Sequence, residues 1–127
     1  MSIAKVGRCI EASGVSKVYG AGTAAAVEAV SSVSFTVPHG QFVAILGPSG
    51  CGKSTLLMMV GGLEPVSSGN IIVNGEPMTG PRTSIGIMFQ DPTLLPWKSA
   101  LDNVLFPVRV LKRSISDYRE AARGLLQ

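Results

Sequence analysis

One glycine-rich segment, residues 47–55, constrains the fold of this chain more than any other feature. It matches the pattern G-x-x-x-x-G-K-[ST], in which a loop joins a strand to a helix and its backbone N–H groups surround phosphate oxygens. The segment consists of Gly47, Pro48, Ser49, Gly50, Cys51, Gly52, Lys53, Ser54 and Thr55. It therefore predicts an α/β fold of the P-loop NTPase class that binds the phosphates of a nucleotide.

Each fixed position of this segment has a physical reason. Glycine at positions 47, 50 and 52 lets the backbone turn tightly enough to point successive N–H groups at one anion. Lys53 adds a positive charge for the β- and γ-phosphates, and the Ser54 hydroxyl is a ligand for Mg²⁺. We therefore expect ATP with Mg²⁺. The alternative is a glycine-rich strand-to-helix turn that carries an incidental lysine.

The flanks of the segment agree with this interpretation. The apolar run 42–46 predicts a strand that is covered on both faces. Residues 53–60 predict a helix whose inward side chains are Leu56, Leu57 and Val60, ended by the glycine pair 61–62.

The rest of the chain predicts mostly β-structure first and helices later. Strands are expected at 9–13, 15–19, 33–37 and 85–89, with a turn at 20–22. A hairpin is expected from residue 71, with its turn at Asn74-Gly75. Ser99 is expected to cap a short helix, helped by Asp102 and interrupted at Pro107. A last helix should begin near Ser116. Its expected inward residues are Tyr118, Ala121, Ala122 and Leu125.

Composition excludes several classes of protein. The chain has 127 residues, 46% hydrophobic and 15% charged, as in a globular protein. Its net charge of +3 comes without a dense run of Lys or Arg, so nucleic acid is not an expected partner. The longest apolar runs fall far short of the ~20 residues of a bilayer span, and Lys5 and Arg8 precede no signal-peptide core. Cys9 and Cys51 are interpreted as reduced thiols.

Three further segments resemble the ATP-binding subunits of ABC transporters. They are Val-Ser-Lys-Val-Tyr-Gly at 15–20, the hairpin at 69–75 and Gly-Ile-Met-Phe-Gln at 86–90. The resemblance extends from about residue 10 to residue 127. Within the family, the run FQDPTLLPWKSALDNV at 89–104 is similar to ATPases of nitrate, sulfonate and taurine importers.

The resemblance implies roles for two more residues. Tyr19 would stack on adenine; the alternative is a core tyrosine on a strand. Gln90 would lie beside Mg²⁺ and the attacking water, sharing the catalytic role with Lys53 and the metal site with Ser54; the alternative is a polar residue that ends a strand. His39, in a Pro-His-Gly turn, does not match the family's switch histidine and is expected to be exposed.

The resemblance also implies partners and a location. Transmembrane permease subunits would contact the loop 90–97, where Leu94, Leu95 and Trp97 form either a docking patch or a local core. A second ATPase subunit would complete a homodimer of the full-length protein. The chain is expected to be soluble and peripheral, at the cytoplasmic face of the membrane.

Several family motifs have no match here. The acidic residues are Glu11, Glu28, Glu64, Glu76, Asp91, Asp102, Asp117 and Glu120, and no two are adjacent as a Walker B Asp-Glu would be. An LSGGQ-like signature and the switch histidine are also missing. Residues 1–127 are therefore interpreted as part of a nucleotide-binding domain. The β subdomain and P-loop core cover about 8–90, and the Q-loop and the start of the helical subdomain cover about 90–127.

Such a part is expected to have an N-terminal antiparallel β portion and an incomplete parallel core. We therefore expect the isolated chain to be marginally stable or aggregation-prone, and hydrolysis-deficient by itself. The alternatives are a non-catalytic nucleotide-binding module, an inert product of a truncated gene, and a small kinase.

Overall fold

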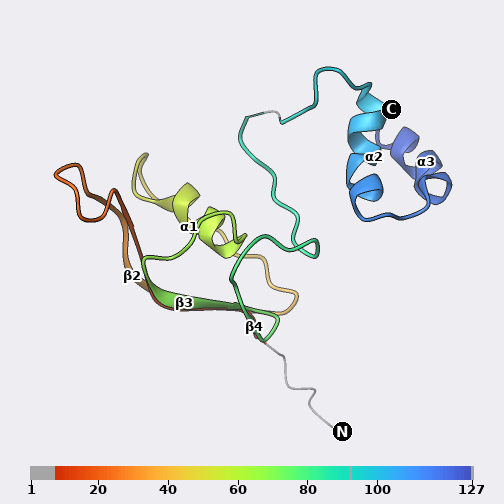
Figure 1. The fold of residues 1–127 in the computed structure, drawn as a ribbon. Coiled ribbons are helices and arrows are strands. Elements are labelled where there is room, and N and C mark those ends of the chain that lie inside the picture. Colours follow the sequence, from red (N-terminus) through yellow and green to blue (C-terminus); the bar gives the residue numbers. More distant parts are fainter. Residues whose placement is uncertain (1–7, 92, 127) are drawn as a thin grey trace, which may run out of the picture. The chain divides into compact units, whose positions relative to one another are not determined.

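The computed structural model describes residues 8–91 and 93–126. The chain divides into two compact units, Met1–Gly86 and Ile87–Gln127 (Figure 1). The first unit contains β1 (Arg8–Tyr19), β2 (Val27–Pro38), α1 (Lys53–Val60), β3 (Ser68–Val73) and β4 (Glu76–Pro77). The second contains α2 (Ala100–Val110) and α3 (Ile115–Gly124). The β-rich start and the later helices were both predicted from the sequence.

The sheet of the first unit is antiparallel throughout, with the strand order β2-β1-β3-β4. Two short strands were predicted where the structure has the single strand β1. The register shifts between Ala12 and Val15, where Gly14 has a φ of 55°. Its N–H leaves the ladder and donates to Ser34 Oγ at 2.8 Å. An extra residue of this kind forms a β-bulge, so the strand continues through the irregularity.

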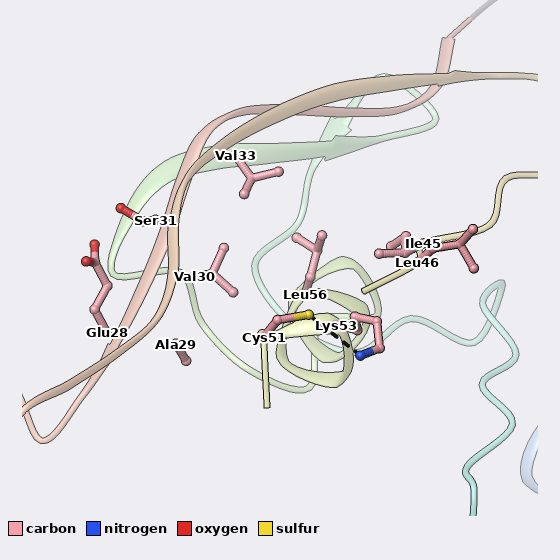
Figure 2. Close-up of a pocket in the computed structure, with 11 residues that line it drawn as sticks. Glu28, Ala29, Val30, Ser31, Val33, Ile45, Leu46, Cys51, Lys53 and Leu56 are labelled. Carbon is pink, nitrogen blue, oxygen red and sulfur yellow. Dashed lines mark hydrogen bonds between the residues drawn. The ribbon is translucent and has the colours of Figure 1, made fainter. Parts of the chain in front are cut away.

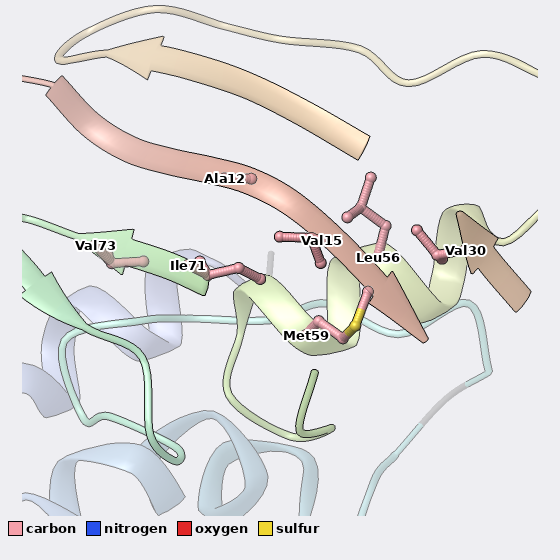
Figure 3. Packing of buried hydrophobic residues seen from close by; sticks show 7 residues of the cluster. All are labelled: Ala12, Val15, Val30, Leu56, Met59, Ile71 and Val73. Atoms are coloured by element: carbon pink, nitrogen blue, oxygen red, sulfur yellow. The ribbon is translucent and has the colours of Figure 1, made fainter. Parts of the chain in front are cut away.

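The core of the first unit lies between α1 and one face of this sheet (Figure 3). Met59 is 1% exposed, and Figure 3 shows it close to Val15, which is fully buried. The bounds predicted for α1 are confirmed, and of its predicted inward residues Leu56 and Val60 contact the core but Leu57 does not. Leu56 and Met59 are buried, whereas Leu57 is 49% exposed. Residues three apart share one face of a helix, and Leu57 is rotated away from that face.

Two predicted strands, 42–46 and 85–89, are not strands in the structure. Phe42 and Leu46 are 94% and 90% exposed, instead of being covered on both faces. A strand needs a neighbour that accepts and donates its backbone hydrogen bonds. Within the described residues neither segment has such a neighbour, and the sheet contains no parallel pair.

The hairpin between β3 and β4 is confirmed. Asn74 and Gly75 have φ values of 52° and 81°, the left-handed conformation that a type I′ turn requires at both central positions. β4 is only two residues long. The turn chemistry therefore predicted the hairpin correctly.

The second unit begins its first helix as expected. Ser99 Oγ accepts a hydrogen bond from Asp102 N at 3.1 Å and donates one to Asp102 Oδ2 at 2.7 Å. The predicted interruption at Pro107 is wrong, because α2 continues to Val110. A single proline removes one backbone donor, and the bond from Leu111 N to Pro107 O at 3.0 Å resumes the helical pattern.

The inward face predicted for the last helix is only partly correct. Ala122 is buried in α3, but Tyr118, Ala121 and Leu125 are exposed. Leu125 follows the last helical residue and caps the C-terminus, so helical periodicity no longer fixes its direction. None of the helices in the described part of the chain has both the length and the apolar content that a bilayer span requires.

We expect acid to loosen the N-terminus of α2. The hydrogen bond from Ser99, helped by the charge of Arg109, outweighs the effect of desolvation and lowers the pKa of Asp102 below its usual value of 3.8. A carboxyl group whose pKa is lower in the folded state stabilises that state above its unfolded pKa, and this contribution is lost as pH falls through the folded pKa. The protection factor of the Asp102 amide, which compares its exchange rate with that of an unstructured chain at the same pH, should therefore fall below about pH 4. In Asp102→Asn, the same residue should show no such pH dependence.

We expect Met59→Ala to lower the free energy of unfolding by about 2–5 kcal/mol, because it opens a cavity in the core. Leu57→Ala, two residues earlier in the same helix, should cost about 1 kcal/mol or less, because Leu57 is half exposed. Urea denaturation of the two variants measures both values. Equal losses would contradict the assigned inward face of α1.

Candidate phosphate-binding site

The glycine-rich loop is held against β2 by one close backbone approach. Gly52 is the N-cap of α1 and has a φ of 90°. A Cβ built on Gly52 would collide with the carbonyl oxygen of Ala29 in β2. Gly50 has a φ of 81° but open space around it. Glycine is therefore required at 52 for both conformation and space, and at 50 for conformation alone.

The N-terminus of α1 is left without a side-chain cap. Gly52 supplies no capping side chain, and the first turn contains no acidic residue. The first N–H groups of a helix have no partner within the helix, and the helix dipole makes this end partly positive. An anion at this position satisfies both requirements.

Lys53 places its ammonium group over the same loop. Its Nζ donates hydrogen bonds to the carbonyl oxygens of Gly47 at 2.8 Å and Pro48 at 2.6 Å, and lies 3.6 Å from Cys51 Sγ (Figure 2). Bonds between an ammonium group and phosphate oxygens are charge-assisted and stronger than bonds to neutral carbonyls. A phosphate group therefore competes well for this lysine.

Two adjoining cavities are associated with the loop. The smaller, about 170 Å³, is lined by Gly50, Gly52, Lys53, Ser54, Thr55 and Ala29. The larger, about 460 Å³, shares Gly52 and Lys53 with it and continues along Glu28 and Val30 of β2 (Figure 2). A polar end beside the loop thus leads into a space with mixed polar and apolar walls.

The residues present fit a magnesium ion that is carried by phosphates. Ser54 is exposed in the first turn of α1 and lines the smaller cavity. Among the described residues, no group of three or more His, Cys, Asp or Glu side chains is placed to hold a metal. Mg²⁺ commonly keeps several waters and binds through substrate phosphates with few protein ligands. The Ser54 hydroxyl is suited to that mode.

Tyr19 lies at the end of β1 and is 39% exposed, so it is not a core tyrosine. The ammonium group of Lys17 lies 4.9 Å from the centre of its ring. Tyr19 is not among the described residues that line the two cavities beside the loop. Its contact with adenine stays a prediction.

Gln90 belongs to the second unit, where it is exposed and does not follow a strand. Its position beside Mg²⁺ therefore stays a prediction as well. His39 is exposed in a turn, as expected.

The loop 90–97 presents apolar side chains at the surface of the second unit; Pro92 lies outside the described residues. Leu94 and Trp97 are 67% and 76% exposed, which contradicts a local core, and Leu95 is half-buried. The side chain of Asn103 in α2 forms hydrogen bonds to the backbone of this loop. Its Oδ1 accepts from Leu95 N at 2.8 Å and its Nδ2 donates to Leu95 O at 3.2 Å. Sequence reasoning missed Asn103, because a helical asparagine gives no signal of its partners.

Known proteins are similar to most of this chain. The family model described as ABC transporter matches residues 30–126. The taurine import ATP-binding protein of Burkholderia thailandensis is 46% identical over 96 residues, which are 76% of this chain and 36% of the relative. The aliphatic sulfonates import ATP-binding protein of Albidiferax ferrireducens is 53% identical over 77 residues, 61% of this chain and 28% of the relative.

A solved structure shows the same fold. The ATP-binding cassette MJ0796, in a dimeric post-hydrolysis state bound to ADP and Pi, superimposes with a TM-score of 0.78 at 28% identity. The match covers 91% of this chain and 54% of that one. The chain thus spans about a third of the length of the curated taurine relative and about half of the solved cassette.

We expect Gly52→Ala to destabilise the first unit more than Gly50→Ala does. Both substitutions place an alanine in the left-handed region, at a cost of about 1–2 kcal/mol. Only the Cβ at position 52 also forces the Ala29 carbonyl aside. Urea denaturation midpoints of the two variants measure the difference. A loss at position 50 that equals or exceeds the loss at 52 would contradict the close approach.

Proposed function

Because the chain belongs to the ABC transporter family, we propose that it binds ATP with Mg²⁺ through residues 47–55 and forms the ATP-binding part of a solute importer. The observation that carries the proposal is the position of Lys53, whose ammonium group lies over a glycine-rich loop at an uncapped helix N-terminus. Backbone N–H groups, the helix dipole and one lysine then act on the same phosphates.

Each residue of the loop contributes a different part of binding. Gly50 and Gly52 give the loop its left-handed turns, so that N–H groups face the phosphate oxygens. Lys53 exchanges its bonds to the Gly47 and Pro48 carbonyls for the β- and γ-phosphates. The Ser54 hydroxyl is the protein ligand for the ion. Mg²⁺ would neutralise part of the phosphate charge. Gln90 is proposed to contact the ion and the attacking water.

A sulfonate is the proposed class of imported solute. The relatives are named as import proteins for taurine, which is an aminosulfonate, and for aliphatic sulfonates. Import follows from those names, and the solute itself would contact other subunits of the transporter. The ATP-binding part provides the energy of transport and not the selectivity for the solute.

We propose partners and a location on the basis of the same family membership. Permease subunits are proposed to dock on the loop 90–97, where Leu94 and Trp97 supply exposed apolar area that Asn103 keeps in place. A second copy of the full-length protein is the proposed dimer partner. We place the chain at the cytoplasmic face of the membrane, as a peripheral subunit. The β subdomain and core are assigned to about 8–90, and the start of the helical subdomain to about 90–127.

We expect Mg·ATP to stabilise the chain, and Lys53→Ala to remove this effect. At a nucleotide concentration of 100 times Kd, the free energy of unfolding should rise by about 2.7 kcal/mol. Lys112→Ala, which removes an exposed lysine of the second unit, is the matched control and should keep the full effect. Denaturation with and without Mg·ATP measures it. Absence of stabilisation in the unmodified chain, or its survival in Lys53→Ala, would refute the proposed site.

A further inference from the structure

Lys17 is the one charged residue that is buried within the described part of the chain, with 7% of its surface exposed. It lies on β1, one of the two inner strands of the sheet, two residues after the buried Val15, and residues two apart on a strand share one face. Burial of an ammonium group is unfavourable unless its charge is compensated. The partners of this lysine therefore show what holds it in place.

Two of these partners lie in the connection that leaves α1. Lys17 Nζ is 2.9 Å from Glu64 Oε2 and donates a hydrogen bond to the carbonyl oxygen of Pro65 at 2.8 Å. Next to this pair, Ser67 N donates to Ser16 O at 2.8 Å, and Val18 N donates to Ser67 Oγ at 2.9 Å. The end of β1 is thus fixed to the segment that follows the helix of the phosphate loop.

The third partner is the ring of Tyr19. The ammonium group lies over this ring, 4.9 Å from its centre, within the range of a cation–π interaction. Residues two apart on a strand share one face, so the side chains of Lys17 and Tyr19 are neighbours. Tyr19 keeps 39% of its surface exposed. The ammonium group of Lys17 therefore covers one part of the ring, and another part is exposed to solvent.

We propose that Lys17 is a positioning residue for nucleobase binding. Its ammonium group, anchored by Glu64 and Pro65, holds the Tyr19 ring in the orientation that stacks on adenine. The inference rests on the proposed ATP-binding function and on the stacking role of Tyr19. It adds that the anchors of Lys17, Glu64 and Pro65, lie in the connection that follows α1, the helix at whose start the phosphate loop lies.

A purely structural role for Lys17 predicts a different result. If the lysine only stabilised the fold, its loss would weaken every contact with the nucleotide, phosphate contacts included. If it positions the ring, its loss weakens recognition of the base alone. A ligand without a base, inorganic tripolyphosphate, separates these two outcomes because it retains the phosphate contacts.

The experiment measures dissociation constants of the full chain for Mg·ATP and for Mg·tripolyphosphate by titration calorimetry. Lys17→Met keeps most of the length and the apolar stem of the side chain but removes the charge. We expect it to weaken Mg·ATP about threefold to tenfold and to leave Mg·tripolyphosphate within about twofold. Lys17→Arg retains a cation that packs on aromatic rings and should restore ATP binding.

A double-mutant cycle with Tyr19→Ala identifies the partner of the lysine. Without the ring, Lys17→Met should cause no further loss of affinity for Mg·ATP. Equal weakening of both ligands in Lys17→Met, or the same loss with and without the ring, would overturn the inference while leaving the phosphate site intact. An unmodified chain that binds neither ligand would instead refute the proposed function, and the inference with it.

Discussion

The approach of Gly52 to the carbonyl oxygen of Ala29 is the constraint on which the rest of the first unit depends. It fixes the start of α1 against β2, and the direction of that helix then decides which of its side chains reach the sheet. Met59 meets Val15 in the core because the helix begins where it does (Figure 3). The same approach leaves the uncapped N–H groups of α1 facing the loop. Packing of the first unit and the geometry of the candidate phosphate site therefore share one origin.

The predicted parts of the fold were those that local chemistry determines. The loop 47–55, the bounds of α1, the Asn74-Gly75 turn and the Ser99 cap each depend on residues close together in the chain. The predicted strands 42–46 and 85–89 failed for the opposite reason. A strand depends on a partner elsewhere, and hydrophobicity alone does not reveal whether that partner is present. Fold class was thus predictable, but the extent of the sheet was not.

The candidate site divides in a similar way. The pattern of glycines with Lys53 predicted the loop at the start of α1, because phosphate binding requires fixed residue types at fixed spacing. The partners of Lys17 were not predictable, since Glu64 and Pro65 meet it only after β1 and the connection beyond α1 have packed together. The same holds for Asn103, whose bonds to the backbone of Leu95 depend on the path of the loop. Local sequence patterns predict which residues contact a ligand, whereas the residues that orient them are brought into contact only by tertiary packing.

The strand order has a consequence for how the first unit assembles. β1 and β2 are neighbours in the chain, so their pairing closes only a short connection. β1 also pairs with β3, and that contact encloses the phosphate loop and all of α1 within one long chain excursion. Long-range pairing of this kind is slow, because the entropy of closing the excursion is lost before the contacts form. We therefore expect the pairing of β1 with β3 to form late in folding, together with the final geometry of the glycine-rich loop that lies between them in the chain.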